Sequence, residues 1–269
     1  MSLPPLLLIG CGKMGGAMLA GWLEQGLPPE TVVVEPHPAA VAGFAGRIRH
    51  VTSFAEIPRD FTPAAVILAT KPQEAPNALP ALAHLVNPET VFLSIMAGKT
   101  VGGLQALLGG VPHVVRAMPN TPAAVRLGFT VAYAGLGVTP AQRELCDTLI
   151  SAVGESAWVE QESLIDPVTA VSGGGPAYVF LLAEVMEQAA ISQGLPPDLA
   201  RRMARATVSG SGALLAASTE DAATLRVNVT SPKGTTERAL AVLMRPEAWP
   251  AIMEEAIEAA TARSRELAG

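Results

Sequence analysis

The chain has 269 residues, of which 49% are hydrophobic and 16% charged, and its formal net charge is −6. This length and composition suffice for two domains, each with its own core. No run of Lys or Arg supplies the clustered cations that nucleic-acid binding needs. Two cysteines are too few for a disulfide framework or a Cys-rich zinc site. We therefore expect no metal, and partners that are small molecules or other copies of the chain.

The apolar runs of the sequence end after about ten residues, whereas a membrane-spanning helix needs roughly 20. The N-terminal apolar stretch leads directly into Gly10 rather than into a small-residue cleavage site. These two features predict a cytoplasmic protein without a membrane segment.

Short β-branched runs alternate with helical stretches up to about residue 160. Because the runs are apolar throughout rather than alternating, they predict a parallel sheet covered by crossover helices on both faces. This arrangement is a doubly wound α/β domain, which we assign to residues 1–160. The expected strands are residues 6–9, 31–34, 65–69, 90–95, 114–117, 130–134 and 157–159.

A glycine-rich loop separates the first expected strand from a helical run at residues 17–24, and it reads Gly10, Cys11, Gly12, Lys13, Met14, Gly15. Strand, loop and helix in this order are the context of a GxGxxG dinucleotide fingerprint. Gly10 would permit the tight turn, Gly12 the approach of backbone N–H groups to a pyrophosphate, and Gly15 close helix packing. The loop therefore predicts a Rossmann-type domain that binds a nicotinamide dinucleotide, with a plain glycine turn as the alternative.

Glu35 follows the second expected strand, roughly 20 residues after Gly15. An acid at this position accepts hydrogen bonds from the ribose hydroxyls and repels a 2′-phosphate. Pro-His-Pro follows Glu35 at residues 36–38, in place of an arginine that could accommodate a 2′-phosphate. Arg47 or Arg49 could instead fold back toward this position. Glu35 thus favours NADH over NADPH, unless it is merely a solvated loop acid.

Beyond residue 160 the strand pattern ends and helical stretches are separated by loops at residues 194–197, 218–221 and 231–234. Residues 161–269 are therefore predicted to form an all-α domain. The helix that contains residues 178–190 is apolar on every face and must be buried all round. Since so small a helical domain can hardly enclose it, we expect a homodimer through this domain.

Five further strings resemble pyrroline-5-carboxylate reductase, in order and at fitting separations over nearly the whole chain. They are ATKP (69–72), SIMAG (94–98), RAMPNTP (116–122), SGGGPAY (172–178) and SPKGTT (231–236). The resemblance implies a Rossmann domain and a helical domain that interlocks with that of a partner subunit. It also implies the reduction of Δ1-pyrroline-5-carboxylate to proline, the last step of proline synthesis, by dimers that can assemble into rings.

The same resemblance implies further cofactor contacts. The residues at the end of the third expected strand would line the adenosine and phosphate side, two residues of SIMAG would back the cofactor, and Asn120 would lie near the nicotinamide. Lys71 precedes a proline and is held extended, so we assign it to cofactor binding rather than catalysis. These implied cofactor residues are Ala69, Thr70, Lys71, Pro72, Met96, Ala97, Asn120 and Asn228.

The resemblance also places the substrate carboxylate on one loop, with the contacts Ser231, Lys233, Gly234, Thr235 and Thr236. Thr236 matches the hydroxyl nearest the ring nitrogen and is the catalytic candidate. The loop precedes an expected helix at residues 237–244, whose free N–H groups and dipole suit an anion. One threonine could instead cap that helix; we expect Thr236 to face the substrate.

Two positions depart from the family pattern. Lys233 stands where the family more often has glycine, so a positive φ there would be strained. Glu35 stands where many members carry a small polar residue and use NADPH.

Reduction of a cyclic imine requires a hydride on one carbon and a proton on the adjacent nitrogen. An imine protonated on entry needs no dedicated acid, and residues 161–269 contain neither His nor Cys. Catalysis would then depend on positioning and electrostatics. The three consecutive glycines at residues 173–175 exceed what a helix break requires, which suggests close backbone approach to a ligand or a partner helix.

Two alternatives remain. A β-hydroxyacid dehydrogenase or related imine reductase shares the two-domain layout, but it carries a catalytic lysine on a helix of the second domain. Here the only lysine after Lys99 is Lys233, in a Pro-Gly loop. The second alternative is a non-catalytic dinucleotide-binding redox sensor. A sensor would need no binding site for a substrate anion, so the SPKGTT loop argues against it.

Overall fold

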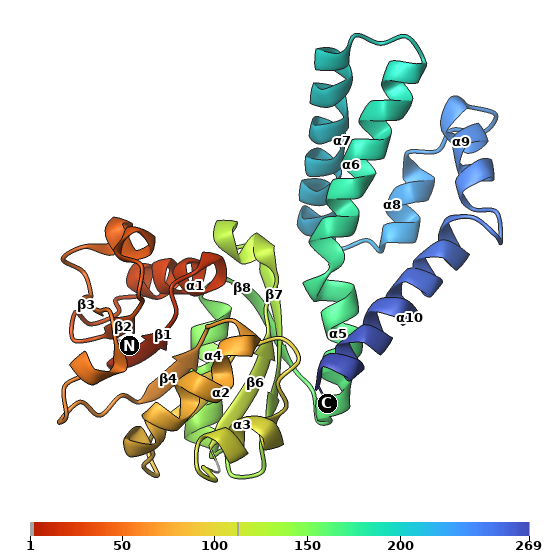
Figure 1. Ribbon diagram of the computed structural model, residues 1–269. Helices are drawn as coiled ribbons and strands as arrows, with labels where there is room; N and C mark the ends of the chain where they lie inside the picture. Colours follow the sequence, from red (N-terminus) through yellow and green to blue (C-terminus); the bar gives the residue numbers. More distant parts are fainter. Residues whose placement is uncertain (1–2, 112, 269) are drawn as a thin grey trace. The chain divides into compact units, whose positions relative to one another are not determined.

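The computed structural model describes residues 3–111 and 113–268. The chain forms two compact units (Figure 1): unit 1 comprises Met1–Gly173 and Ala260–Gly269, and unit 2 comprises Gly174–Ala259. The chain thus leaves unit 1 after Gly173 and returns at Ala260. This division lies later than the expected boundary at residue 160, and it returns the C-terminal residues to unit 1.

Unit 1 is built on a sheet to which eight strands contribute among the described residues, in the order β3-β2-β1-β4-β5-β6-β7-β8. The order β3-β2-β1-β4-β5-β6 is that of a Rossmann fold, and these six strands are parallel. The predicted fold class is therefore confirmed. The strands are β1 (Leu6–Ile9), β2 (Val32–Val34), β3 (Arg49–Val51), β4 (Ala65–Leu68), β5 (Val91–Ser94), β6 (Val114–Met118), β7 (Gly128–Ala134) and β8 (Gly154–Trp158).

The sheet differs from the expectation at both edges. β3 was not expected, because Arg49 and His50 interrupt the apolar pattern of this short edge strand. β7 runs antiparallel to β6, and β8 is parallel to β7, so this end of the sheet is not parallel to the rest. The apolar pattern could not predict this direction, because β7 carries buried residues much as the parallel strands do.

Helices cover both faces of the sheet, and each face has its own apolar core. α1 and α4 pack on one face, where Trp22 Nε1 donates a hydrogen bond of 2.8 Å to the carbonyl of Leu149. α2 and α3 supply residues to the core on the other face, so consecutive strand residues point to opposite cores as the pleat requires. The α-helices are α1 (Lys13–Glu24), α2 (Ala75–Ala78), α3 (Val101–Leu107), α4 (Pro140–Ser151) and α5 (Ile165–Val168).

Unit 2 is helical, which confirms the prediction of an all-α second domain. Its helices are α6 (Gly175–Ser192), α7 (Pro197–Ala217), α8 (Ala222–Asn228), α9 (Thr235–Leu243) and the first part of α10 (Trp249–Ala268). α6 and α7 lie side by side (Figure 1), and the turn between them contains Gly194 at φ 90°.

α6 exposes its apolar side chains in the single chain. None of its residues is buried, and Phe180 is 67% exposed. Within the described residues, the helical stretch Glu162–Ser192 has the length and mean hydropathy, 1.3, of a helix that could cross a membrane, judged by length and composition alone. The run length used in the sequence prediction missed this stretch, because single polar residues interrupt it. An apolar helix of this kind requires a covering surface outside the chain.

Candidate active site

A pocket of about 540 Å³ opens at the carboxyl ends of β1, β2 and β4. β1 lies between β2 and β4, where the strand order reverses, and this is the position at which doubly wound sheets bind their ligands. Of the residues assigned to the cofactor from sequence, the pocket is lined by Gly10, Gly12, Glu35, Ala69, Thr70 and Lys71.

Each of the three glycines of the loop occupies its position for a different physical reason. Gly10 has φ 90°, and a Cβ there would lie 2.9 Å from the carbonyl oxygen of Ala69. A Cβ on Gly15 would collide with the carbonyl oxygen of Gly10, so this glycine allows α1 to pack against the loop. Gly12 is the N-cap of α1 and has open space around its Cβ position. The N-terminus of α1 is therefore accessible to a pyrophosphate.

Glu35 is buried and tied to the glycine loop. Its Oε2 accepts a hydrogen bond of 2.8 Å from the backbone N–H of Cys11, and its Oε1 accepts one of 2.9 Å from that of His37. The side chain also lines the pocket. The alternative of a solvated loop acid is wrong, because only 7% of Glu35 is exposed.

The pocket carries little positive charge beside this carboxylate. Lys71 and His37 line it, and no arginine is among the described residues that do so. Arg49 lies in β3 and is exposed, and Arg47 is likewise outside the lining. Among the described lining residues, no guanidinium therefore offsets the charge of Glu35.

Cys11 acts through its backbone. Its side chain is 3% exposed, and burial followed by the charge of Glu35 raises the pKa of the thiol to about 11. The thiol therefore stays protonated at neutral pH, whereas the N–H of the same residue holds Glu35.

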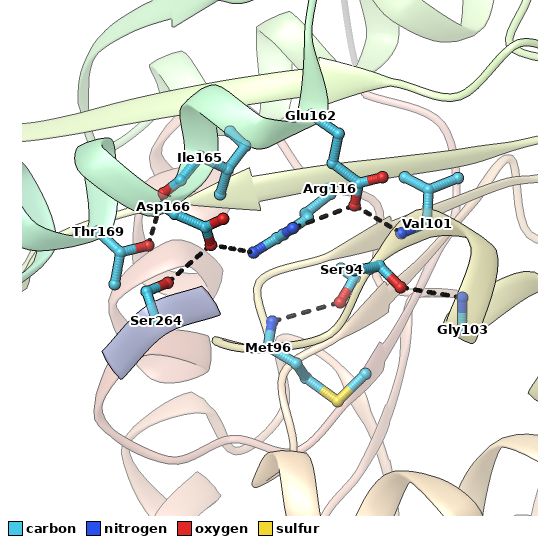
Figure 2. A network of polar contacts seen from close by, with 11 residues as sticks. Ser94, Met96, Val101, Gly103, Arg116, Glu162, Ile165, Asp166, Thr169 and Ser264 are labelled. Atoms are coloured by element: carbon cyan, nitrogen blue, oxygen red, sulfur yellow. Dashed lines mark hydrogen bonds and ion pairs between the residues drawn. The ribbon is translucent and has the colours of Figure 1, made fainter. Parts of the chain in front are cut away.

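The strand ends next to the pocket are also ordered by polar contacts. The Thr70 hydroxyl donates to Met96 Sδ at 3.7 Å, and the Met96 N–H donates to Ser94 Oγ at 3.3 Å (Figure 2). Lys71 has the extended backbone expected before Pro72, and it is exposed. Several residues assigned to the cofactor lie outside the lining of this pocket, namely Cys11, Lys13, Met14, Gly15, Pro72, Met96 and Ala97.

Asn120 has its side-chain amide engaged within unit 1. Its Oδ1 accepts a hydrogen bond of 2.8 Å from the Phe129 N–H, and its Nδ2 donates to Ser172 Oγ at 3.2 Å. The Ser172 hydroxyl donates in turn to the Phe129 carbonyl at 3.4 Å. Asn120 thus holds the loop after β6 to β7, and it does not line the described pocket.

In unit 2, the loop assigned to the substrate forms a tight turn before α9. The N–H of Gly234 donates to the Ser231 carbonyl at 3.0 Å, and that of Lys233 donates to Glu237 Oε2 at 3.1 Å. Lys233 has φ 60°, so the positive φ considered from sequence is present at this non-glycine residue. Helix α9 stabilises the turn through Glu237 in its first turn.

α9 begins at Thr235, earlier than the expected start at residue 237, and its N-cap is Gly234. No side chain caps the helix, so the alternative that a threonine serves as N-cap is wrong. Thr235 and Thr236 are both exposed in the first turn, next to N–H groups that lack intrahelical acceptors. Asn228, at the end of α8, donates to Glu220 Oε2 at 3.2 Å.

Sequence reasoning missed the pocket residues that follow β3, which are Thr52, Ser53 and Phe54. The hydroxyls of Thr52 and Ser53 both donate to Glu56 Oε1 at 2.8 Å. The Thr-Ser pair at residues 52 and 53 indicates a turn in the sequence. Because β3 was not predicted, nothing in the sequence placed this turn at the carboxyl edge of the sheet.

The strand order, the glycine loop at the switch point and the acid at the end of β2 define a Rossmann-type dinucleotide-binding protein with a helical second unit. A profile described as "NADP oxidoreductase coenzyme F420-dependent" matches residues 6–98, and one described as "Pyrroline-5-carboxylate reductase dimerisation" matches residues 162–267. Pyrroline-5-carboxylate reductase of Pseudomonas aeruginosa is 40% identical over 271 aligned residues, covering 100% of this chain and 98% of the relative.

Two solved structures agree with this similarity. The structure of a pyrroline-5-carboxylate reductase from Coxiella burnetii has a TM-score of 0.90 and 30% identity, with 99% of each chain covered. That of Plasmodium falciparum pyrroline carboxylate reductase, with NADP bound, has a TM-score of 0.83 and 25% identity, with each chain covered completely. The chain belongs to the pyrroline-5-carboxylate reductase family. It is an NAD(P)H-dependent oxidoreductase with a dimerisation domain, and neither sequence alternative is retained.

Proposed function

We propose that this chain reduces Δ1-pyrroline-5-carboxylate to L-proline, the last step of proline biosynthesis, in the cytoplasm. The observation that carries the proposal is the first turn of α9, where a tight turn and an uncapped helix N-terminus present two exposed threonines. An uncapped helix N-terminus suits a carboxylate, which the substrate carries. The family to which the chain belongs supports the same reaction.

The residues of unit 1 fit a nicotinamide dinucleotide. Gly12 leaves room at the N-terminus of α1 for the pyrophosphate, and Glu35 can accept hydrogen bonds from the ribose hydroxyls. When bound, the cofactor supplies the hydride. We propose that NADH is preferred over NADPH, because Glu35 lines a pocket whose described residues include no arginine. The relative from Plasmodium falciparum holds NADP, so the preference is a property proposed for this chain alone.

The substrate residues are assigned to the turn before α9. Lys233 and the N–H groups of the first turn would bind the carboxylate, with Ser231, Gly234 and Thr235 shaping the seat. Thr236 would hydrogen-bond the ring nitrogen and so orient the imine carbon for hydride addition. A substrate that arrives protonated receives its proton from solvent, so no histidine is needed in this loop.

We propose that residues 1–160 bind the dinucleotide and residues 161–269 bind substrate and a second subunit. α6 supports the homodimer, because its exposed apolar side chains, such as Phe180 at 67% and Leu181 at 56%, need a covering surface. Dimers of this kind would assemble further into a ring, which an analytical ultracentrifugation series over protein concentration would detect.

The proposal is tested by following NADH or NADPH oxidation with Δ1-pyrroline-5-carboxylate, with the reverse oxidation of 3-hydroxyacids as the comparison. We expect turnover with the imine only, and proline as the product by amino-acid analysis. Tight cofactor binding without turnover would contradict the proposed reaction.

A further inference from the structure

The loop between β5 and α3, residues 95–100, lies at the carboxyl end of β5 within unit 1. Its Met96 is 2% exposed and accepts the 3.7 Å hydrogen bond from Thr70, which lines the described pocket. A doubly wound sheet binds a dinucleotide with two mononucleotide-binding halves, and β5 belongs to the second half. The glycine loop and Glu35 belong to the first half. The β5–α3 loop is therefore placed to contact the nicotinamide half of a bound cofactor.

Glu162 fixes the end of this loop that leads into α3 (Figure 2). Its Oε1 accepts a hydrogen bond of 2.7 Å from the N–H of Val101, the first residue of α3. Since the N–H groups of the first helical turn lack intrahelical acceptors, the carboxylate supplies one and also complements the helix dipole. Glu162 belongs to η6 (Glu162–Leu164), 61 residues away from Val101 in the chain. The start of α3 thus depends on a distant segment of unit 1.

Glu162 is itself held by a buried polar network around Arg116. The guanidinium of Arg116, a residue that is 3% exposed, lies 3.1 Å from Glu162 Oε1 and 3.6 Å from Asp166 Oδ1. Asp166 Oδ1 also accepts a hydrogen bond of 2.8 Å from the Ser264 hydroxyl. A buried network whose described members all have partners is rigid. Removal of Glu162 alone would leave Arg116 paired with Asp166, so no buried cation would lose its last partner.

The β5–α3 loop has a second, steric support. Gly98 is buried at φ 68°, and a Cβ there would lie 3.0 Å from Leu267 Cβ in the last turn of α10. The Thr100 hydroxyl, at the N-cap of α3, accepts a hydrogen bond of 3.1 Å from the Gly103 N–H. Packing therefore limits the movement of the loop at Gly98, and Glu162 determines where the loop joins α3.

We propose that Glu162 is a positioning residue for the nicotinamide half of the cofactor, because it fixes the loop that carries Met96 and Ala97. The inference rests on the proposed function, in which these two residues contact the cofactor. Glu162 acts through the backbone of Val101 and needs no contact with the dinucleotide itself. Binding and reaction depend steeply on such placement, since a shift of about 1 Å can cost on the order of a hundredfold in rate.

The test compares Glu162→Ala with Glu162→Gln, which keeps an oxygen acceptor for the Val101 N–H. Calorimetric titration gives the dissociation constants of the dinucleotide that the wild type prefers, NADH or NADPH, and of its adenosine half, AMP or 2′,5′-ADP. We expect Glu162→Ala to weaken dinucleotide binding about tenfold, while binding of the adenosine half stays within about twofold of wild type. Glu162→Gln should regain most of the lost affinity.

Glu160→Ala is the matched control, because it removes an exposed carboxylate from the same segment and should leave both dissociation constants unchanged. Partial unfolding of a variant lowers the number of binding sites but changes neither dissociation constant. Equal weakening of the dinucleotide and its adenosine half in Glu162→Ala, or no weakening of either, would overturn the inference. So would a Glu162→Gln variant as weak as Glu162→Ala. Wild-type protein that does not turn over the imine would refute the proposed function itself.

Discussion

The carboxylate of Glu35 lies 2.8 Å from the backbone nitrogen of Cys11, so the acid at the end of β2 holds the glycine loop that follows β1. Its second oxygen is held by the His37 N–H, and the side chain is 7% exposed. Glu35 thereby combines a structural function in the loop with a negative charge at the pocket. A change at this residue must be designed to separate these two contributions.

Glu35→Gln removes the charge and retains one oxygen as acceptor. We expect the wild type to prefer NADH, and the variant to raise the ratio of kcat/KM for NADPH over NADH about tenfold, because repulsion of the 2′-phosphate is relieved. Glu74→Gln is the control, since Glu74 also lines the pocket but is exposed. Steady-state kinetics with both cofactors measure the ratio, and a wild-type preference for NADPH would contradict the function assigned to Glu35.

Thr236→Val removes a hydroxyl from the first turn of α9 and keeps the side-chain shape. We expect kcat/KM for the imine to fall roughly ten- to a hundredfold, because one polar contact in the transition state is lost. Thr219→Val, in an exposed loop before α8, should leave the kinetics unchanged. Wild-type activity in Thr236→Val would remove Thr236 from the site.

Lys233 has φ 60°, a conformation that glycine adopts without strain. Lys233→Gly should therefore leave the free energy of unfolding unchanged or raise it by up to about 1 kcal/mol, which thermal unfolding detects as an unchanged or higher Tm. The KM for Δ1-pyrroline-5-carboxylate should rise, because the ammonium group of Lys233 no longer attracts the substrate carboxylate. Lys233→Asn tolerates the same φ and also lacks the charge, so it should share the rise in KM. An unchanged KM in both variants would show that the lysine side chain does not contact substrate.

Arg126 also has a positive φ, 62°, and its guanidinium forms two contacts with Glu24, at 2.8 and 3.1 Å. It also donates to the Ala17 carbonyl at 3.2 Å, which links η5 (Thr121–Val125) to α1. Arg126→Ala loses these contacts and keeps the strained backbone, whereas Arg126→Gly loses them but relieves the strain. We expect Arg126→Gly to be more stable than Arg126→Ala by about 1 kcal/mol in urea unfolding. The reverse order would mean that the backbone rearranges in the variants.

Burial, followed by the charge of Glu35, raises the pKa of Cys11 from 9.0 to about 11, and burial raises that of Cys146 further. At pH 8 the thiolate fraction of Cys11 should be about a hundredfold below that of an ordinary thiol, so iodoacetamide should label the native protein slowly. The unfolded chain ionises first as pH rises through 9, so both thiols reduce stability above that pH. Mass spectrometry of labelled native and urea-unfolded protein, with Cys11→Ser as control, measures the difference. Rapid labelling of Cys11 in native protein at pH 8 would contradict its burial.

The glycine loop and the strands around it could be predicted from sequence, because each depends on neighbours in the chain. The spacing of the loop glycines, Gly10, Gly12 and Gly15, follows from the strand, turn and helix that the loop joins. Glu35 follows β2, at a separation set by one helical crossover. The apolar pattern of α6 likewise predicted a helix that needs an external cover, and all of its residues are unburied in the single chain. Local periodicity and turn chemistry suffice for features of this kind.

The tertiary structure decided the contacts between distant residues. Whether β7 runs parallel or antiparallel to β6 depends on the path of the connection between them, and both directions bury the same residues. The Arg116 network joins residues from β6, α5 and α10, and no local pattern relates Asp166 to Ser264. The start of α9 at Thr235 depends on how Gly234 and Ser231 close their turn. Sequence thus determined the elements and the ligand class, whereas long-range packing determined which polar groups hold one another.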